Sequence, residues 1–207
     1  MIEPFEQYAI EYDHWFEKNK FIYLSELELI KSLIPKKGVG LEIGIGTGRF
    51  AVPLKIKVGI ELSNKMAEIS RSKGLNVVQA KAEKIPFNDN FFDYALLVTT
   101  ICFVDDIKKS FKEIYRILKP DGVIIIGFID KNSYMGKKYQ REKTKSKFYK
   151  HARFFDTDEV IRLLTENNFK EYLVKQTLFT GPDNLTGIDK IVQGYGKGSF
   201  VGIKAMK

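Results

Sequence analysis

A glycine loop constrains the fold of this chain more than any other feature of its sequence. Residues 41–50 read LEIGIGTGRF, and the apolar run at 39–43 predicts a short strand that leads into the loop. A second apolar run at 57–62 ends in an acid, Glu61, about 20 residues after Glu42. A strand, a glycine loop, a helix start and an acid on the next strand are typical of a nucleotide-binding βαβ unit, with a plain structural turn as the alternative.

The spacing of the glycines distinguishes two classes of nucleotide. The glycines alternate as Gly-x-Gly-x-Gly, whereas a dinucleotide fold needs a further glycine where this chain has Arg49. Glu42 would repel a pyrophosphate, but it can pair, directly or through water, with the ammonium of an amino acid. Glu61 is placed to accept the two hydroxyls of a ribose. The loop therefore predicts S-adenosylmethionine (SAM) as the ligand, and a dehydrogenase remains the alternative.

Apolar runs alternate with helical patterns through the middle of the chain, which predicts an α/β fold with a parallel sheet and right-handed crossovers. The last two apolar runs, 171–179 and 199–205, are separated by a stretch rich in Gly, Asp and Asn that has no room for a clear crossover helix. We therefore expect these two strands to pair antiparallel. The other strands are expected at 39–43, 57–62, 76–80, 94–99 and 123–129.

Length and charge indicate one domain with a basic segment. The 207 residues suit a single domain, 1–207, with a helical cap at 1–36 and an inserted lid at 130–155. The net charge of +8 is local, because residues 131–153 hold nine Lys and Arg, interleaved with aromatic residues, against one acid. A single cysteine excludes a disulfide framework and a Cys-rich metal site, and we expect no metal. Without a recognisable signal peptide or a membrane-spanning run, the protein is expected to be cytoplasmic.

Further segments in a fixed order give the chain a resemblance to a known family. They are VGIELS at 58–63, AEKIPF at 82–87, RILKPDG at 116–122, and the pairs Phe154-Phe155 and Asn168-Phe169. Together with the glycine loop, they resemble the class I SAM-dependent methyltransferases, specifically the ubiquinone/menaquinone-biosynthesis-like group called type 11. The resemblance implies a Rossmann-like seven-stranded sheet in the order 3-2-1-4-5-7-6, with strand 7 antiparallel and helices on both faces.

The same resemblance implies roles for residues of a SAM site. The implied contacts are Glu42, Gly44, Gly46 and Thr47 at the methionine end, Glu61 at the ribose, Leu62, Ala82 and Glu83 at the adenine, and Thr99 beneath the sulfonium. Lys81 stands where the family usually has Asp, so the contact to the adenine amino group is left to Glu83 or to the backbone.

Methyl transfer from a sulfonium depends on alignment, because the leaving group is already activated. A general base is needed only if the acceptor must lose a proton, and the sequence shows no catalytic triad. The candidates for a catalytic side chain are His14, Tyr12 and His151, with an ordinary surface or core position as the alternative for each. Tyr8, Tyr12 and Trp15 share one helix face, which indicates either a lid over the sulfonium or a core stripe.

The basic segment at 131–153 leaves several hypotheses for the acceptor. A basic lid over a small-molecule acceptor would attract an acidic or phosphorylated compound. An RNA or protein methyltransferase would use the segment as an electrostatic footprint and its aromatic rings as stacking platforms. A solvated lid without a partner and a non-catalytic SAM-binding protein are further alternatives. We favour the small acceptor because the rest of the chain is neutral and carries no RNA-binding motif; the sequence predicts no oligomeric state.

Overall fold

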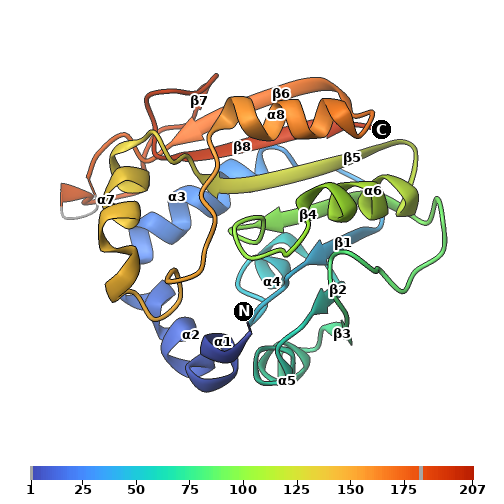
Figure 1. Ribbon diagram of the computed structural model, residues 1–207, viewed down its shortest axis with the longest axis horizontal. Helices are drawn as coiled ribbons and strands as arrows, with labels where there is room; N and C mark the ends of the chain where they lie inside the picture. The colour runs from blue at the N-terminus through green and yellow to red at the C-terminus, as the bar shows by residue number, and fades with distance from the viewer. Residues whose placement is uncertain (1, 182–183) are drawn as a thin grey trace.

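The computed structural model describes residues 2–181 and 184–207, which form one eight-stranded sheet with helices on both of its faces (Figure 1). The strands are β1 (Gly40–Ile43), β2 (Val58–Glu61), β3 (Asn76–Gln79), β4 (Phe92–Val98), β5 (Leu118–Ile129), β6 (Lys170–Thr177), β7 (Val192–Gln193) and β8 (Phe200–Met206). The helices are α1 (Glu3–Gln7), α2 (Ala9–Lys18), α3 (Lys20–Lys31), α4 (Ala51–Leu54), α5 (Asn64–Ser72), α6 (Ile107–Ile117), α7 (Tyr134–Glu142), the 3-10 turn η1 (Lys143–Lys145) and α8 (Thr157–Glu166).

The strand order is β3-β2-β1-β4-β5-β8-β6-β7. Strands β1 to β5 pair in parallel, and β8 lies antiparallel between β5 and β6. This confirms the α/β fold, the order implied by the resemblance and the antiparallel pairing of the last two long strands. The predicted count of seven strands is wrong by one. The additional β7 is two exposed residues long at the sheet edge, so it leaves no apolar alternation in the sequence.

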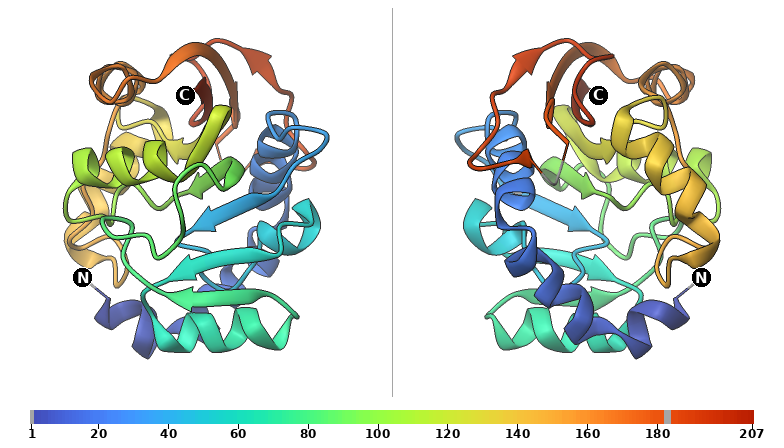
Figure 2. Two further views of the ribbon diagram at one scale, coloured as in Figure 1. Left: turned by 90° about the vertical axis from the view of Figure 1, so that its right-hand side faces the viewer. Right: turned by 90° about the vertical axis from the view of Figure 1, so that its left-hand side faces the viewer.

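Two apolar clusters fill the space between the sheet and its helices. Helices α6 and α8 cover one face, where Phe111 and Leu164 are fully buried. Helices α3, α4 and α5 cover the other face, where Leu29 and Ile30 are fully buried (Figure 2). The central parallel strands are therefore shielded on both sides, as their continuous apolar runs predict.

Side-chain caps fix where the helices begin beside the strand ends. The Ser63 hydroxyl caps α5, which ends just before Gly74, a residue with φ +80°. The Asp106 carboxylate caps α6. At the start of α8, Asp156 and Glu159 form a reciprocal capping box. Each of these side chains satisfies backbone N–H groups that have no partner within the helix, so the helix starts at a defined residue.

The basic segment contains a helix that its sequence does not reveal. Helix α7 begins at the Ser133 cap and buries Met135, with Tyr139 one turn later on the same face. Two apolar positions among many lysines make too weak a period to be recognised. Backbone hydrogen bonds then tie the segment down, from Arg153 N to the Cys102 carbonyl at the end of β4 (2.9 Å). No helix in the described residues has the length and hydropathy needed to cross a membrane.

Candidate functional site

The carboxyl ends of β1, β2 and β4 open into a cavity of about 430 Å³, a volume typical of small-molecule sites. Parallel α/β sheets bind ligands at this edge, at the point where the strand order reverses, which here lies between β1 and β4. The glycine loop and Glu61 form one wall, and Ala82 and Glu83 form another. Phe5 and Tyr12 of the N-terminal helices also line the cavity, so these helices close part of its opening.

Two glycines of the loop have different structural roles. Gly44 and Gly46 both adopt left-handed backbone conformations, with φ of +68° and +55°. A Cβ atom on Gly44 would lie 2.6 Å from the Thr100 side chain, so the packing excludes any substituent. A Cβ atom on Gly46 would have only Tyr12 within 4 Å, at 3.8 Å, because this residue faces the cavity. Gly46 therefore presents bare backbone to a ligand.

Glu61 holds the loop in place through backbone donors. Its Oε2 accepts a hydrogen bond from Gly46 N at 2.8 Å, and its Oε1 accepts from Leu62 N at 2.8 Å and Ser63 N at 2.9 Å. Burial raises the pKa of Glu61, and the three backbone N–H groups oppose that rise. The carboxylate has about four lone-pair sites and three are occupied, so Oε2 retains one to accept a ribose hydroxyl, and a second hydroxyl would replace a backbone donor.

Glu42 is a buried carboxyl beside the same loop. Its side chain is 2% exposed, and its Oε2 has no hydrogen-bond partner among the described residues. Burial raises the pKa of Glu42 well above its usual value, and the negative charge of Glu61 raises it further. A buried carboxyl without a partner is costly, and a nearby cation relieves that cost. The acids and bare backbone here thus fit an adenosyl ligand that carries an ammonium group.

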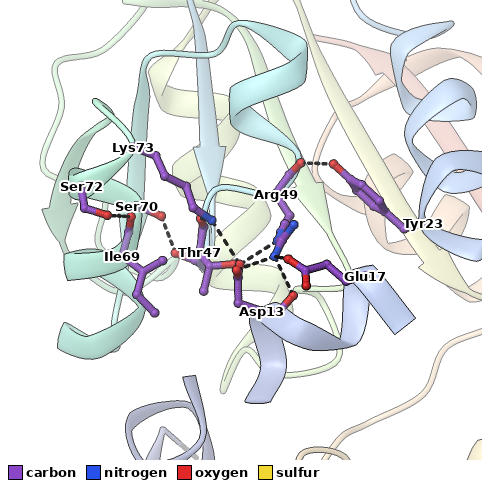
Figure 3. Close-up of polar contacts among 10 residues, drawn as sticks. Asp13, Glu17, Tyr23, Thr47, Arg49, Ile69, Ser70, Ser72 and Lys73 are labelled. Carbon is purple, nitrogen blue, oxygen red and sulfur yellow. Dashed lines mark hydrogen bonds and ion pairs between the residues drawn. The ribbon is translucent and has the colours of Figure 1, made fainter. Parts of the chain in front are cut away.

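Asp13 connects the N-terminal helices to the glycine loop (Figure 3). Its carboxylate accepts hydrogen bonds from Arg49 Nε at 2.7 Å and from Lys73 Nζ at 3.1 Å, and Lys73 also donates to the Thr47 carbonyl at 2.8 Å. Burial acts to raise the pKa of Asp13, but these donors lower it to about 2. Arg49, which occupies the position of the missing glycine, therefore fastens α2 to the loop.

Glu6 holds helix α1 over the cavity. The Glu6 carboxylate accepts a hydrogen bond from Lys65 N at 3.3 Å and also accepts one from Asn64 N, at the start of α5. An acid at this place also interacts favourably with the positive end of the helix dipole. Ile2 and Phe5, which precede Glu6 in the chain, line the cavity. The first turns of the chain therefore rest directly on the candidate site.

Thr99 ends β4 at a strained position between two cavities. Its φ of +50° is unusual for a β-branched residue, and its N–H donates to the Gly127 carbonyl at 2.7 Å. Thr99 lines both the large cavity and a second cavity of about 20 Å³, where Tyr139, Tyr149 and Phe154 form part of the wall. Strain of this kind persists where the surroundings hold it, and it is concentrated at functional positions.

Aromatic rings connect the N-terminal cap with the basic segment above this point. The Tyr149 ring stacks on Tyr139 and Phe103, with centroid distances of 5.3 and 5.7 Å. The Phe148 ring meets Tyr12 edge to face at 5.6 Å. Apart from Tyr134, which is exposed, the aromatic residues that alternate with the bases in the sequence thus turn inward, while most of the bases are exposed.

Most of the residues implied as cofactor contacts line the large cavity. They are Gly44, Gly46, Glu61, Leu62, Ala82, Glu83 and Thr99. Glu42 and Thr47 are buried beside the loop without lining the cavity. Among the candidates for catalysis, Tyr12 lines the cavity, whereas His14 and His151 are exposed and line neither cavity.

Phe103 and Asp105 are among the residues of the cavity wall that sequence reasoning overlooked. Both follow the end of β4, which was the available signal, because side chains just beyond a parallel strand reach the binding edge. Asp105 pairs with Lys81 at 3.0 Å. An acid therefore stands beside Lys81, although it comes from a different loop. Cys102 lines the smaller cavity, and burial raises the pKa of its thiol to about 12, which keeps it protonated.

Comparison with protein families identifies similarity to a methyltransferase domain. A model described as a methyltransferase domain matches residues 41–126, and one described as Bicoid-interacting protein 3 matches residues 100–197. An uncharacterized protein of Methanocaldococcus jannaschii is 48% identical over 203 residues, which cover 98% of each chain. A ubiquinone/menaquinone biosynthesis C-methyltransferase of Haemophilus ducreyi is 33% identical over 101 residues, which cover 42% of this chain and 39% of that protein.

Solved structures extend this likeness to the whole chain. A SAM-dependent methyltransferase from Thermotoga maritima, described as a possible histamine N-methyltransferase, is 51% identical, covers 100% of both chains and superposes with a TM-score of 0.98. A SAM-dependent methyltransferase from Archaeoglobus fulgidus has a TM-score of 0.72 at 16% identity, with 95% of this chain and 99% of that chain covered. This second likeness concerns the fold alone.

Proposed function

The chain belongs to the family of SAM-dependent methyltransferases, and we propose that it transfers the methyl group of SAM to a small acceptor bound beneath residues 130–155. SAM supplies an activated methyl group on a sulfonium, so the protein's own contribution is to hold two reactants in line and exclude water. The observation that carries the acceptor proposal is the group of aromatic rings of the basic segment around the second cavity at Thr99, called here the aromatic chamber, which adjoins the cofactor cavity. Its own volume of about 20 Å³ holds about one water molecule, so an acceptor would share the larger cavity or displace some of the rings.

We propose specific roles for the residues around the cofactor cavity. Glu42 would pair with the methionine ammonium, directly or through water, because its Oε2 lacks a partner among the described residues. Gly46 would let the ligand rest on bare backbone, and Glu61 would accept the ribose hydroxyls. Remaining contacts would come from Gly44 and Thr47 at the methionine end, Leu62, Ala82 and Glu83 at the adenine, and Thr99 beneath the sulfonium.

The enclosure of the chamber favours a small acceptor. Tyr149 and Phe154 are partly buried, and Phe155 is 3% exposed, so the chamber offers rings rather than an open groove. A polymer would need an open groove beside Thr99, and the stacked rings of Phe103 and Tyr149 fill that position. The basic side chains point to solvent, where they would influence which molecules approach rather than which are held.

The Thermotoga relative adds a chemical direction to this proposal. It is described as a possible histamine N-methyltransferase, and it matches this chain over its whole length. A small amine is therefore the first acceptor class to test here.

RNA is a second candidate because of the exposed bases of the lid. Within the described part of the chain, only Lys131 and Lys147 of the basic segment form ion pairs, and Lys137, Arg141 and Lys145 are exposed. Unpaired bases on one surface can bind phosphates. Binding to RNA that weakens steeply with salt, together with methyl transfer to RNA, would favour this alternative.

The decisive experiment separates cofactor binding from methyl transfer. Calorimetry should show saturable binding of SAM and of its demethylated product, S-adenosylhomocysteine (SAH), and no comparable binding of NADH. Transfer of a labelled methyl group should then be measured to small amines, small carboxylic and phosphorylated compounds, RNA and a basic peptide. We expect turnover on small molecules only. Turnover on RNA or peptide alone would overturn the acceptor proposal, and binding of SAM without any turnover would indicate a binding protein.

A further inference from the structure

The wall of the large cavity contains an ion pair whose two partners come from different loops. Lys81 lies in the loop after β3, and Asp105 lies in the loop between β4 and α6. The Lys81 ammonium donates a hydrogen bond to Oδ2 of Asp105 at 3.0 Å. Both residues line the cavity, and each side chain is more than half exposed. Because an exposed ion pair contributes little to stability, stability alone does not explain why this pair stands in the cavity wall.

Glu83 fixes the position of Asp105. Its Oε1 accepts hydrogen bonds from the backbone N–H groups of Asp105 and Asp106 at 2.8 and 3.0 Å. The Asp106 carboxylate caps α6, so the loop is held at the point where this helix begins. A carboxylate oxygen has two lone pairs, so Oε1 of Glu83 is fully used by these two donors. Glu83 thus borders the cavity, while its carboxylate is committed to holding the loop that carries Asp105.

The ion pair retains a free acceptor and a free donor side by side. No other described residue donates a hydrogen bond to the Asp105 carboxylate, so its Oδ1 keeps its acceptor capacity. The Lys81 ammonium has three protons and uses one of them on Asp105. The Watson–Crick edge of adenine presents the complementary set, with a donor at the N6 amino group and an acceptor at the neighbouring N1.

Apolar residues of the same wall suit the faces of an adenine ring. Ala82 and Val104, which neighbour the pair in the sequence, both line the cavity. Apolar side chains pack against the faces of a ligand ring, and a few polar groups fix its edge. Gln79 lines the same cavity, but it is neutral and its side-chain amide donates to the Leu62 carbonyl at 3.1 Å. The charged pair therefore offers the stronger hydrogen bonds to a base edge.

Resting on the proposed function, we propose that Lys81 and Asp105 select the adenine of the cofactor: the Asp105 carboxylate accepts a hydrogen bond from the N6 amino group, and the Lys81 ammonium donates one to N1. Asp usually stands in the family at the position of Lys81, so the role of an acid at the base edge passes here to a residue of the next loop. A 6-oxo base presents an acceptor in place of the amino donor and a protonated N1 in place of the acceptor. Such a base loses both contacts and leaves the pair without partners.

The test compares SAH with S-inosylhomocysteine, its 6-oxo analogue, by calorimetric titration. Wild-type protein should bind SAH at least about tenfold more tightly, equivalent to about 1.4 kcal/mol. In Asp105→Asn this preference should fall below about twofold, because an amide donates to a 6-oxo group as readily as it accepts from an amino group. Glu166→Gln is the matched control, since it breaks an exposed ion pair with Lys108 that lies outside the cavity, and it should keep the full preference.

A second analogue tests the contact of Lys81. In 1-deaza-SAH a carbon atom replaces N1, so wild-type protein should bind it at least about threefold more weakly than SAH. Lys81→Met keeps most of the side-chain stem and removes the donor, and this variant should bind the two ligands equally. The unfolding midpoints of Lys81→Met and Asp105→Asn should stay close to that of wild type, because the pair is exposed.

The outcomes separate this proposal from the cofactor site on which it rests. Equal binding of SAH and S-inosylhomocysteine by wild-type protein, or full preference for SAH in Asp105→Asn, would overturn the role of Asp105. Equal binding of SAH and 1-deaza-SAH by wild-type protein would overturn the role of Lys81. In each of these cases SAH still binds, and the proposed cofactor site stands. Absence of SAH binding by wild-type protein would instead overturn the cofactor site and the adenine contacts together.

Discussion

The glycine-loop wall and the aromatic lid close the same site by different physical means. In the loop wall, Glu61 fixes three backbone N–H groups, and Asp13 joins two cationic side chains to the loop. These contacts are directional and tolerate little displacement. In the lid, the Tyr149 ring stacks on Tyr139 and on Phe103 of the loop after β4. Ring packing accepts several geometries at similar energy.

Cofactor binding and acceptor binding place different demands on these two parts of a methyltransferase. The cofactor is the same molecule in every turnover, so a rigid wall with defined hydrogen-bond partners suits it. Acceptors differ between relatives, and a lid of packed rings can be repacked around a new one without dismantling the loop. Substitutions in the loop wall should therefore affect cofactor affinity strongly, whereas substitutions in the lid should leave it nearly unchanged.

The largest effect is expected from Glu61→Ala. The variant loses the acceptor for Gly46 N and the charge that would bind the ribose, so SAM affinity should fall by about 2–3 kcal/mol, or roughly 30- to 150-fold. Calorimetric titration with SAM and SAH measures this loss. An affinity close to that of wild type would show that the loop wall does not hold the cofactor through this acid. Substitutions in the loop wall and in the lid would then no longer differ in their effect on cofactor affinity.

A smaller effect is expected from Asp13→Asn, which removes the charge at the centre of the network in Figure 3. The pKa of Asp13 in the folded protein is about 2, below the value of about 3.9 for an unfolded chain. Its stabilisation is therefore fully present above about pH 4 and is lost as the pH falls through 2. Urea unfolding at pH 7 should show a loss of roughly 1–2 kcal/mol in the variant after allowance for solvent screening.

The contribution of the Asp13 charge to stability can be tested further by measuring unfolding at low pH. The difference in unfolding free energy between wild type and Asp13→Asn should shrink as the pH approaches 2, because both proteins then carry a neutral side chain at this position. A difference that stays constant between pH 7 and pH 3 or rises toward acid would contradict the assigned pKa, and with it the idea that charge fastens α2 to the loop.

The smallest effect is expected from Lys147→Gln in the lid. Lys147 pairs with Glu11 at 2.9 Å, with both side chains more than half exposed, and it lies 4.4 Å from the centre of the Tyr8 ring. Exposed contacts of this kind contribute little, so thermal unfolding should reveal a change of less than about 1 kcal/mol and SAM affinity should not move. A larger loss would mean that charge, and not ring packing, closes the lid.

The parts of the molecule that the sequence predicted are those where a local rule dictates the residue. The alternating glycines and Glu61 at its strand end each satisfy backbone requirements that can be recognised within a few residues. The strand order followed from the family resemblance together with the missing crossover before β8. In these places local sequence and global fold agree, and prediction succeeds.

The features that escaped prediction depend on contacts between distant segments. Glu26 lies in a helix rich in glutamate, where an acid normally faces solvent, yet the packing of α3 on the sheet leaves it buried. Asp13 meets Arg49 across 36 residues, and Asp105 reaches Lys81 from another loop. Helix α7 offers too few apolar positions for its period to be visible. A pattern within a few residues cannot reveal contacts between segments that lie far apart in the sequence.

The contact of Glu6 with the start of α5 bears on the order of events in each catalytic cycle. Phe5 and Tyr12 line the large cavity, so a molecule held deep inside it would exchange with solvent only when the N-terminal helices move. If SAM binds there as proposed, exchange of SAH for SAM would depend on that movement. A protein with loosened N-terminal helices would cycle faster and retain its cofactor less well.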